Sequence, residues 1–457
     1  MKLKSLIQNV NRLEVAEVEI EFIPGIPQIH FLGLPDRLIK ESFYRIKSAL
    51  KSCGYKFPLT SQMIVNIKPN HLRKSSRGVE LAVALGILLK TEQLEASLIK
   101  PEWVIYGELG LDGNIYEPSD LAQSMIHLKD FEVLTGRGQD SSCYRIESLN
   151  SLEINFTTTP KKIKRPEEGI HRLYTEQEAE FLFLAATSGL HSLLAGDSGA
   201  GKSTLAHSLN SFLPAPHEDQ HIRFENNWRP VIAPHQSITP AAFIGGGGNL
   251  YEGEVERVQG GILLLDELLE FDPEIIESLR GPMTGEKLRI SRGSGFRELN
   301  SDFQVVATTN LCPCGKWTPL KKNISCRFSR TKCSRYLEKF SGPILDRFGI
   351  LLYSTYREKR KIKGHDILKR VQNYFEFSAK NPELLSQTEQ PEMLETYYQN
   401  LSTRRKNYLS KVASIYAIES FAQGSSELKP TLNLIHHYNR AEQWVIRPFE
   451  QLEKGMS

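Results

Sequence analysis

The sequence predicts an α/β protein built around a nucleotide-binding parallel sheet, with a helical region after it. A phosphate-binding pattern, G-x-x-x-x-G-K-[ST], occupies residues 196–203, between a strand-like apolar run at 190–195 and a helical pattern. Short apolar runs at 261–265 and 303–308 alternate with helical patterns, which favours a parallel sheet. From about residue 357 onward, the periodic patterns are helical.

The composition is that of an ordinary globular protein with several domains. The 457 residues are 24% charged and 40% hydrophobic, enough for about two to four cores. The net charge of +3 excludes a polycation, so any nucleic-acid surface must be local. The N-terminal residues do not form a signal peptide, and no apolar run is long enough to span a membrane. Because the six cysteines suit a reducing compartment, we expect a cytoplasmic protein with no membrane partner.

Three domains are predicted along the chain. Residues 1–159 combine strand-like alternation with helical patterns and form the first. The basic segment 160–166 has proline at both ends and is expected to be an exposed linker. Residues 167–356 form the nucleotide-binding core, and residues 357–457 a helical lid. Within the core, Thr175 and Glu178 have the spacing of a capping box that opens a helix at 176–188. The lid helices are expected at 366–379, 392–400, 404–423 and 431–446.

The phosphate loop predicts ATP and Mg²⁺ as cofactors. Its glycines allow backbone N–H groups to approach phosphate oxygens, and the N-terminus of the following helix favours the same negative charge. Lys202 supplies a positive charge for the outer phosphates, and Ser203 a hydroxyl for Mg²⁺. The expected nucleotide contacts are Gly196, Asp197, Ser198, Gly199, Ala200, Gly201, Lys202, Ser203 and Thr204.

Polar residues at the ends of the two later strands complete a hydrolytic site. Asp266 can hold Mg²⁺ through water, and Glu267 can orient and deprotonate the attacking water. Asn310 ends the next strand and can position that water, although asparagine is also common in turns. Arg347 follows an apolar stretch and can stabilise transition-state charge on a neighbour's nucleotide, unless it is a plain surface arginine. Arg404, at the start of a lid helix, can touch the phosphates of its own chain.

Four cysteines follow Asn310 within a short segment. Cys312, Cys314, Cys326 and Cys333 are numerous and close enough to form a tetrahedral thiolate site for structural zinc. Their spacing is not that of a standard zinc knuckle, so reduced thiols in a loop are the alternative.

Three segments inserted in the core are candidates for gripping a nucleic acid. Residues 316–339 interleave Lys and Arg with aromatic residues, a composition that suits phosphate contacts and base stacking. Residues 285–297 read as a basic β-hairpin. Residues 233–239 precede four glycines, 245–248, which are expected to form a mobile loop. Any one of these segments could be only a solvated surface, but together they favour a substrate interface.

The chain resembles the ComM/YifB group of magnesium-chelatase-like AAA+ ATPases over nearly its full length. Besides the phosphate loop, several short sequence motifs carry the resemblance. They are Phe31-Leu-Gly-Leu-Pro-Asp36, Gly107-Glu-Leu-Gly-Leu-Asp-Gly113, Ala233-Pro-His235, Gly245 to Gly247, Leu265-Asp-Glu-Leu268, Cys312-Pro-Cys-Gly315 and Ser341-Gly-Pro-Ile-Leu-Asp-Arg347.

The resemblance implies an ATP-hydrolysing ring hexamer with nucleotide sites between subunits. It implies a motor that acts on DNA and extends recombination intermediates by branch migration in natural transformation. The family's nucleotide roles carry over to Lys202, Ser203, Asp266, Glu267, Asn310, Arg347 and Arg404. A protein-remodelling ATPase, resembling the ATPase subunit of magnesium chelatase, is the alternative.

The resemblance also implies a Lon-protease-type fold for residues 1–159. Peptide hydrolysis by that fold needs a Ser–Lys dyad. Ser76 falls at the serine position, but the lysine position falls on Ala122, so we expect this domain to be non-catalytic. The chain departs from the family elsewhere too. Gln236 replaces the second histidine after Ala-Pro, Leu269 replaces a proline, and Phe328 replaces a cysteine whose thiolate Cys333 could restore.

Overall fold

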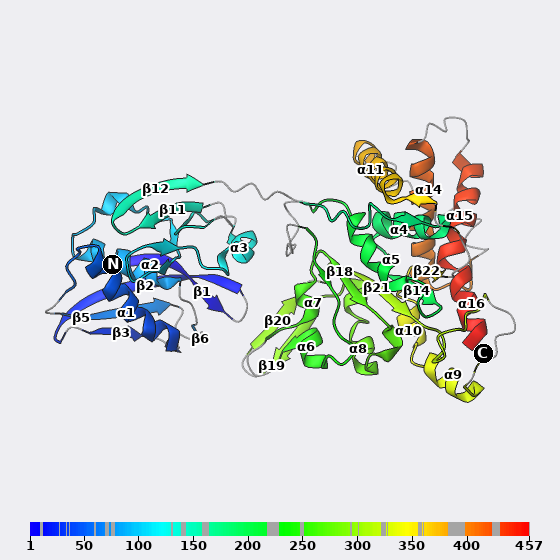
Figure 1. Cartoon of the computed structure of the whole chain (residues 1–457), viewed down its shortest axis with the longest axis horizontal. Helices are drawn as coiled ribbons and strands as arrows, with labels where there is room; N and C mark the ends of the chain where they lie inside the picture. Colours follow the sequence, from blue (N-terminus) through cyan, green and yellow to red (C-terminus); the bar gives the residue numbers. More distant parts are fainter. Residues whose placement is uncertain are drawn as a thin grey trace. The chain divides into compact units, whose positions relative to one another are not determined.

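The computed structural model divides into two compact units, Met1–Lys162 and Ile163–Ser457 (Figure 1). The finer predicted boundary, at residues 356 and 357, stays a prediction. The structure describes all residues except 10–11, 27, 33, 36, 59–60, 69–72, 75–77, 129–130, 139–142, 158–163, 217–227, 247–250, 293–294, 300, 321–325, 327, 355–358, 360, 383–397, 423–429 and 457.

The first unit is a mixed eight-stranded sheet with order β12-β11-β10-β7-β1-β2-β5-β3. Helix α2 (Val79–Lys90) is buried from Val79 to Leu88, so its sequence is apolar on all sides. Gly86 permits its close approach to the sheet, because a Cβ there would lie 2.4 Å from Ile20 Cδ1. The other main elements are β1 (Lys2–Asn9), β2 (Arg12–Pro24), β3 (Ile29–Leu32), α1 (Arg37–Ser52), β5 (Ser61–Lys68), β7 (Val104–Ile105), α3 (Leu121–Ser124), β10 (Val133–Thr135), β11 (Cys143–Ser148) and β12 (Ser151–Thr157).

The second unit contains the predicted parallel sheet, five strands in the order β15-β18-β21-β14-β22. The strands are β14 (Ser192–Gly196), β15 (Val231–Ile232), β18 (Ile262–Leu265), β21 (Gln304–Thr309) and β22 (Ile350–Ser354). The neighbouring pairs are all parallel. Every residue of β14, β18, β21 and β22 is buried, and most of these residues are apolar, as expected for a parallel sheet covered on both faces. The α/β prediction is therefore confirmed.

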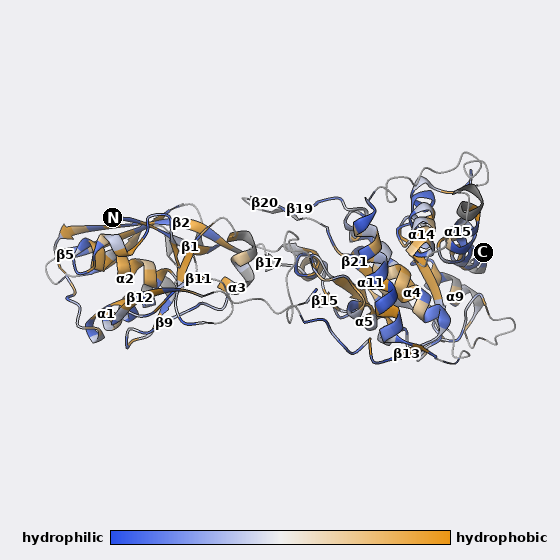
Figure 2. Cartoon of the chain, turned by 90° about the horizontal axis from the view of Figure 1, so that it is seen from above, coloured by the Kyte–Doolittle hydropathy of each residue, from blue (hydrophilic) through white to orange (hydrophobic). Residues whose placement is uncertain are grey.

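The helix predicted at 176–188 is confirmed in the second unit. Helix α4 (Glu176–Ser188), largely hydrophobic in Figure 2, opens with the predicted capping box. Thr175 Oγ1 accepts the Glu178 N–H at 3.1 Å, and Glu178 Oε2 accepts the Thr175 N–H at 2.9 Å. The phosphate loop leads into α5 (Lys202–Ser208), which ends in a 3-10 turn, Leu209–Ser211. The shorter helices are α6 (Pro240–Ile244), α7 (Glu254–Arg257), α8 (Pro273–Ser278), α9 (Arg330–Leu337) and α10 (Gly342–Leu345).

The C-terminal helices pack against α4 and the edge strand β22. They are α11 (Gly364–Lys380), α14 (Thr403–Ala422), α15 (Pro430–Val445) and α16 (Arg447–Met456). The helix predicted at 392–400 lies mostly outside the described residues. Arg370 of α11 fixes this packing, because its guanidinium bonds Glu180 and Glu419 and lies 3.8 Å from the Phe183 ring centre. The lid is thus held to the core by buried charges as well as by apolar contacts.

The prediction of an exposed linker at 160–166 is wrong for Arg165, whose side chain is partly buried. Residues 160–163 of the predicted linker lie outside the described residues. The Arg165 guanidinium donates to the carbonyls of Ser211 and Leu213, at 2.9 and 2.6 Å, and stacks on the Trp228 ring at 4.6 Å. This cation binds the carbonyl end of the phosphate-loop helix, where the helix dipole favours positive charge.

Two further expectations concern the inserted segments. The predicted basic hairpin is confirmed as β19 (Leu288–Arg292) paired with β20 (Gly295–Leu299). The prediction of a mobile glycine loop at 245–248 is wrong for two of its residues. Gly245 and Gly246 form β16 and pair with β17 (Tyr251–Glu252), while 247 and 248 lie outside the described residues. In the part of the chain that the structure describes, no helix combines the length and apolar character needed to cross a bilayer.

Replacing Thr175 by alanine tests the capping box. Thr175→Ala leaves the first-turn N–H groups of α4 without their side-chain acceptor, which should lower the free energy of unfolding of the second unit by about 1 kcal/mol. Thr187→Ala is the matched control, because this hydroxyl bonds the Phe183 carbonyl four residues earlier and caps nothing. Urea unfolding of the full chain measures both, and equal losses would contradict the capping role.

Candidate functional site

The candidate site lies at the carboxyl edge of the five-stranded sheet. Strand β14 runs into the phosphate loop, β18 ends one residue before Asp266, and β21 ends one residue before Asn310. Since the three strands are parallel, with Ala195 opposite Thr309 and Leu265 opposite Ala307, their ends meet at one edge. The sequence-predicted residues of the hydrolytic site therefore come from three elements that the sheet places together.

Two glycines of the phosphate loop occupy positions that a side chain could not. Gly196 has φ 150°, and a Cβ there would lie 2.3 Å from the Ser354 carbonyl oxygen of β22. Gly201 has φ 84° in the left-handed region and forms the N-cap of α5. The loop can therefore turn tightly between strand and helix, with its backbone at the helix N-terminus.

Lys202 is buried at the centre of the site. Its Nζ donates to the carbonyls of Gly196 and Asp197, at 3.1 and 2.7 Å, and to Asn310 Oδ1 at 3.0 Å. Burial lowers the pKa of Lys202, while the nearby carboxylates of Asp197, Asp266 and Glu267 oppose that shift. The ammonium is held by neutral oxygens that a phosphate oxygen could replace at a gain in Coulomb energy.

Asp266 supplies the oxygen that would hold a divalent cation. Ser203 Oγ donates to Asp266 Oδ1 at 2.7 Å, and Thr308 Oγ1 donates to the same oxygen. A hydroxyl and a carboxylate at this distance are the hard oxygen ligands that Mg²⁺ uses beside nucleotide phosphates. The residues present therefore fit Mg²⁺.

Glu267 is held in an uncommon backbone conformation. Its φ of 56° and ψ of 55° lie in the left-handed region, which non-glycine residues seldom adopt. Its N–H donates to Thr308 Oγ1 at 3.0 Å, and its exposed carboxylate accepts the Gln236 side-chain amide at 2.9 Å. The backbone turn aims the Glu267 side chain out of the sheet edge, where a water molecule could reach it.

Gln236, which the sequence marks as a departure from the family and as part of the candidate segment 233–239, lies beside the acid pair. Its Nε2 donates to Glu267 Oε2, and more weakly to the Asp266 carbonyl at 3.4 Å. The signal available in the sequence was its position shortly after an apolar dipeptide, Val231–Ile232, which forms the strand next to β18. A polar residue after a neighbouring strand belongs at the same edge as the acid pair.

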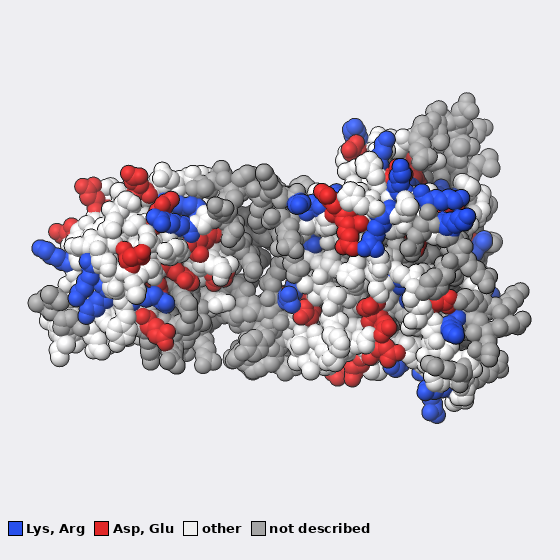
Figure 3. Space-filling view, viewed as in Figure 1, with Lys and Arg blue, Asp and Glu red and all other residues white. Residues whose placement is uncertain are grey.

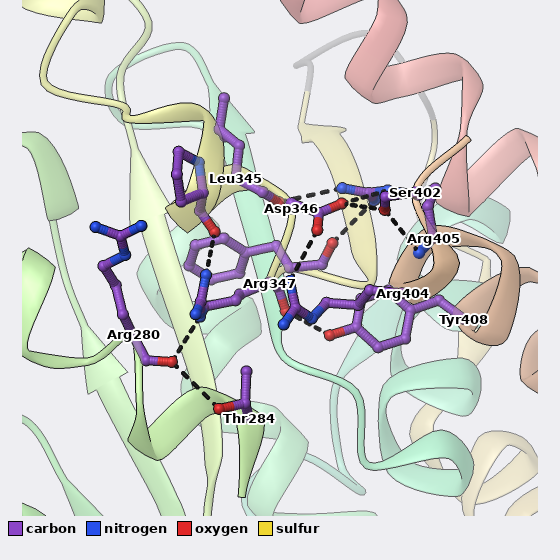
Figure 4. Close-up of polar contacts among 11 residues, drawn as sticks. Arg280, Thr284, Leu345, Asp346, Arg347, Ser402, Arg404, Arg405 and Tyr408 are labelled. Atoms are coloured by element: carbon purple, nitrogen blue, oxygen red, sulfur yellow. Dashed lines mark hydrogen bonds and ion pairs between the residues drawn. The ribbon is translucent and has the colours of Figure 1, made fainter. Parts of the chain in front are cut away.

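The two predicted arginines lie close to each other and to Asp346 (Figure 4). Arg404 Nη1 bonds Asp346 Oδ2 at 2.8 Å, and Ser402 Oγ donates to Asp346 Oδ1 at 2.7 Å. Arg347, which follows Asp346 in the chain, donates from Nε to the Arg280 carbonyl at 2.6 Å. The expected contact of Arg404 with the phosphates of its own chain stays a prediction.

Arg405 fixes the lid beneath this pair. Its buried guanidinium donates to the carbonyls of Phe348 and Val445 at 3.0 Å and to that of Leu345 at 3.2 Å. Burial lowers the pKa of Arg347, and the neighbouring Arg404 and Arg280 lower it further. These cations repel one another, so an anion that bound beside them would be stabilised by their charges.

The cysteines gather as predicted. The sulfurs of Cys312, Cys326 and Cys333 lie 3.3 to 3.6 Å from one another, and Cys314 Sγ lies 3.2 Å from Cys312 Sγ. Four sulfurs bound tetrahedrally at about 2.3 Å from zinc would be about 3.8 Å apart. The Phe328 N–H donates to Cys326 Sγ and lowers the pKa of that thiol to about 7. The sulfurs of Cys312, Cys326 and Cys333 are therefore close enough to share one metal ion, and Cys314 lies beside Cys312.

The candidate nucleic-acid segments are only partly described. Lys332 lies 4.3 Å from the Phe328 ring centre and Lys339 lies 5.8 Å from that of Tyr336, so cations and aromatics do pair there. The side chains of the hairpin arginines Arg289, Arg292 and Arg297 lie outside the described residues. On the face shown in Figure 3, Lys and Arg are interspersed with Asp and Glu.

The predicted loss of peptidase chemistry in the first unit stays a prediction. Ser76 lies outside the described residues, and Ala122 lies in α3. Alanine offers no base to a serine nucleophile wherever the serine lies.

Comparison with known families agrees with this geometry. A profile described as "Magnesium chelatase, subunit ChlI" matches residues 170–362, which hold all three strand-end elements and Arg347. A second, "Subunit ChlI of Mg-chelatase", matches residues 18–133 in the first unit.

Curated relatives match across both units. The chain is 29% identical to the competence protein ComM of Haemophilus influenzae, over 73% of this chain and 72% of that protein. It is 28% identical to the uncharacterized protein YifB of Escherichia coli, with the same coverage. An uncharacterized protein of Mycobacterium tuberculosis, Rv2897c, is 28% identical over 73% of each chain. The chain belongs to the ComM/YifB family of magnesium-chelatase-like AAA+ ATPases.

Proposed function

We propose that this chain is a subunit of an ATP-driven ring motor that acts on DNA. The observation that carries the ATPase part is the meeting of Lys202, Asp266, Glu267 and Asn310 at one sheet edge. These residues supply phosphate binding, cation binding, a general base and a polar positioning group, which together are what phosphoryl transfer to water requires.

The proposed mechanism follows from these contacts. The loop backbone and Lys202 bind the β- and γ-phosphates, and Lys202 exchanges its carbonyl partners for phosphate oxygens. Ser203 and Asp266 would hold Mg²⁺, which would neutralise developing phosphate charge. Asn310 orients a water molecule, and Glu267 takes its proton as the water oxygen bonds to the γ-phosphorus. The bond from that phosphorus to the β–γ bridging oxygen breaks, which releases ADP and phosphate. Gln236 holds the Glu267 carboxylate until that water is in place.

The proposed ring rests on the arginines together with the family resemblance. Arg347 Nη1 donates to the Pro343 carbonyl and Arg404 bonds Asp346, whereas Lys202 donates to Gly196, Asp197 and Asn310. We propose that Arg347 reaches the nucleotide of an adjacent identical subunit, in the hexamer that the family resemblance implies, and that Arg404 touches the phosphates of its own chain. Each ATP site is then built by two chains, which couples hydrolysis to movement between subunits.

DNA is the proposed substrate of the motor, and branch migration of recombination intermediates is the proposed activity. The named function of the ComM relative is competence, and the basic hairpin β19–β20 is inserted between the two catalytic strands β18 and β21. Hydrolysis at Glu267 would move the ends of those strands and hence the hairpin. A protein-remodelling ATPase is the second candidate, favoured by the match to profiles named for a magnesium chelatase subunit.

We further propose that Cys312, Cys314, Cys326 and Cys333 hold structural zinc. The cluster contains four sulfurs within contact of a neighbour, and on metal binding each thiol would lose its proton to solvent and bind as the thiolate.

Full-length protein, four-way junction DNA and MgATP test the motor directly. We expect DNA to stimulate ATP hydrolysis and the junction to be converted into its branch-migrated products. Both effects should be strongest at low salt, because phosphate contacts weaken steeply with salt. An ATPase indifferent to DNA, with an unchanged junction, would sink the DNA proposal. Co-purification with a chelatase partner would then support protein remodelling.

Glu267→Gln tests the base. Because the amide cannot accept the proton, kcat for ATP should fall about 10²- to 10⁴-fold while the Kd for MgATP stays near that of the wild type. Glu274→Gln, an exposed acid at the start of α8, is the matched control and should keep full activity. Lys202→Ala should instead lose ATP binding itself. Equal effects of Glu267→Gln and Glu274→Gln on kcat would remove Glu267 from the mechanism.

Subunit mixing tests the two arginines. Arg347→Ala and Glu267→Gln chains should each be nearly inactive, since an arginine finger contributes about 10³- to 10⁵-fold. Their mixture should regain ATPase activity, because an intact arginine from one chain can serve an intact Glu267 in another. The same experiment with Arg404→Ala decides which chain that arginine serves. A mixture no more active than its parts would show that the arginine acts within its own chain.

A further inference from the structure

The cysteine cluster is joined to the nucleotide site by direct contacts. The Gly315 carbonyl, at the end of the Cys312–Gly315 turn, accepts the N–H of Ser198 in the phosphate loop at 2.8 Å. On the other side, Tyr336 of α9 donates its hydroxyl to Glu270 at 2.9 Å. Lys339 Nζ donates to the Leu269 carbonyl at 2.5 Å, in the segment that follows Glu267.

The turn that carries the first two cysteines is seated tightly on the loop. Gly315 has φ 68°, and its N–H donates to the Cys312 carbonyl at 2.8 Å. A Cβ at residue 315 would lie 3.0 Å from Ser198 Cβ, so the two backbones are already near contact. Cys312 itself is 2% exposed and follows Asn310 by two residues. A displacement of Cys312 would therefore be felt by both Ser198 and Asn310.

The four free cysteines of the cluster come from the turn, from α9 and from the chain between them, so a metal bound to all four would cross-link these parts. Cys312 and Cys314 come from the turn, Cys333 comes from α9, and Cys326 lies between them in the chain. Without a bound metal, the thiols offer each other only weak S–H contacts, which stabilise little. Four metal–thiolate bonds would instead fix the turn and α9 as one body against the phosphate loop and the segment after Glu267.

We propose that a metal held by Cys312, Cys314, Cys326 and Cys333 braces the phosphate loop, so that the affinity for MgATP depends on occupancy of the cysteine site. The inference rests on the proposed ATPase function and on the proposed zinc, and adds the coupling between them. The route is the hydrogen bond from Ser198 to Gly315 and the short connection from Asn310 to Cys312. Metal loss frees the turn, and the loop loses its support.

Metal content and nucleotide affinity of the full chain test the proposal. The purified wild type should contain about one zinc per chain, and Co²⁺ in its place should give the intense visible bands of tetrahedral thiolate coordination. A chelator should raise the Kd for a fluorescent ATP analogue with Mg²⁺ at least about fivefold, the lower end of ordinary coupling between sites. Added Zn²⁺ should restore the affinity.

Two variants separate the metal from its coupling. Cys333→Ser should lose the zinc and the affinity together. Gly315→Ala should keep the zinc and the cobalt bands but weaken MgATP binding, because its Cβ presses on Ser198 at a backbone angle that alanine disfavours. Cys53→Ser, a partly buried cysteine of the first unit outside the cluster, is the matched control and should change neither value.

Each outcome decides between the parts of the proposal. A wild type that takes up neither zinc nor cobalt overturns the metal site. A metal-free chain that binds MgATP as tightly as the metal-loaded one overturns the coupling and leaves the ATPase intact. A metal-loaded wild type that binds no MgATP overturns the proposed function itself. If Cys333→Ser fails to fold by circular dichroism, reversible removal of zinc from the wild type decides the question.

Discussion

One carboxylate oxygen of Asp266 joins the elements on which the site depends. Strands β14 and β18 are not neighbours, because β21 lies between them, so their axes are about 10 Å apart. Ser203 from α5 and Thr308 from β21 both donate to Asp266 Oδ1, which ties the phosphate loop, the acid pair and the middle strand together. A charged acceptor with two hydroxyl donors is a strong contact in a partly buried place.

The same contact explains the geometry of the groups around it. Thr308 donates to Asp266 and accepts the N–H of Glu267, so a single side chain positions both acids. The left-handed backbone of Glu267 is maintained by that bond and by the packing of Leu268 and Leu269 behind it. Lys202, bound to Asn310, completes the connection across the edge. The site is therefore organised before a nucleotide arrives, which reduces the ordering cost of binding.

The sequence predicted the fold and this part of the site because their signals are local. A phosphate loop needs glycines at fixed spacing, and a strand ending in acids is read directly from neighbouring residues. The pairing of Gln236 with Glu267, of Arg404 with Asp346 and of Arg165 with the end of α5 joins residues far apart in the chain. Such pairs follow from strand order and helix packing, which local periodicity does not determine. Cys333 was found only because its residue type is rare.

A single segment connects the two nucleotide sites that each chain would serve. It runs from Asn310, which contacts Lys202, through the cysteines and α9 to Arg347. Between β21 and α9, the described residues 310–320, 326 and 328–329 form no strand or helix, so no regular hydrogen bonding stiffens them. A cross-link among its cysteines shortens the free chain and lowers the entropy that must be lost to hold both ends in place. Stiffness in this segment is what would allow a change at Asn310 to be felt at Arg347, since a slack connection absorbs movement. The placement of the cysteines between Asn310 and Arg347 is therefore suited to the proposed motor, in which each chain would contribute residues to two nucleotide sites.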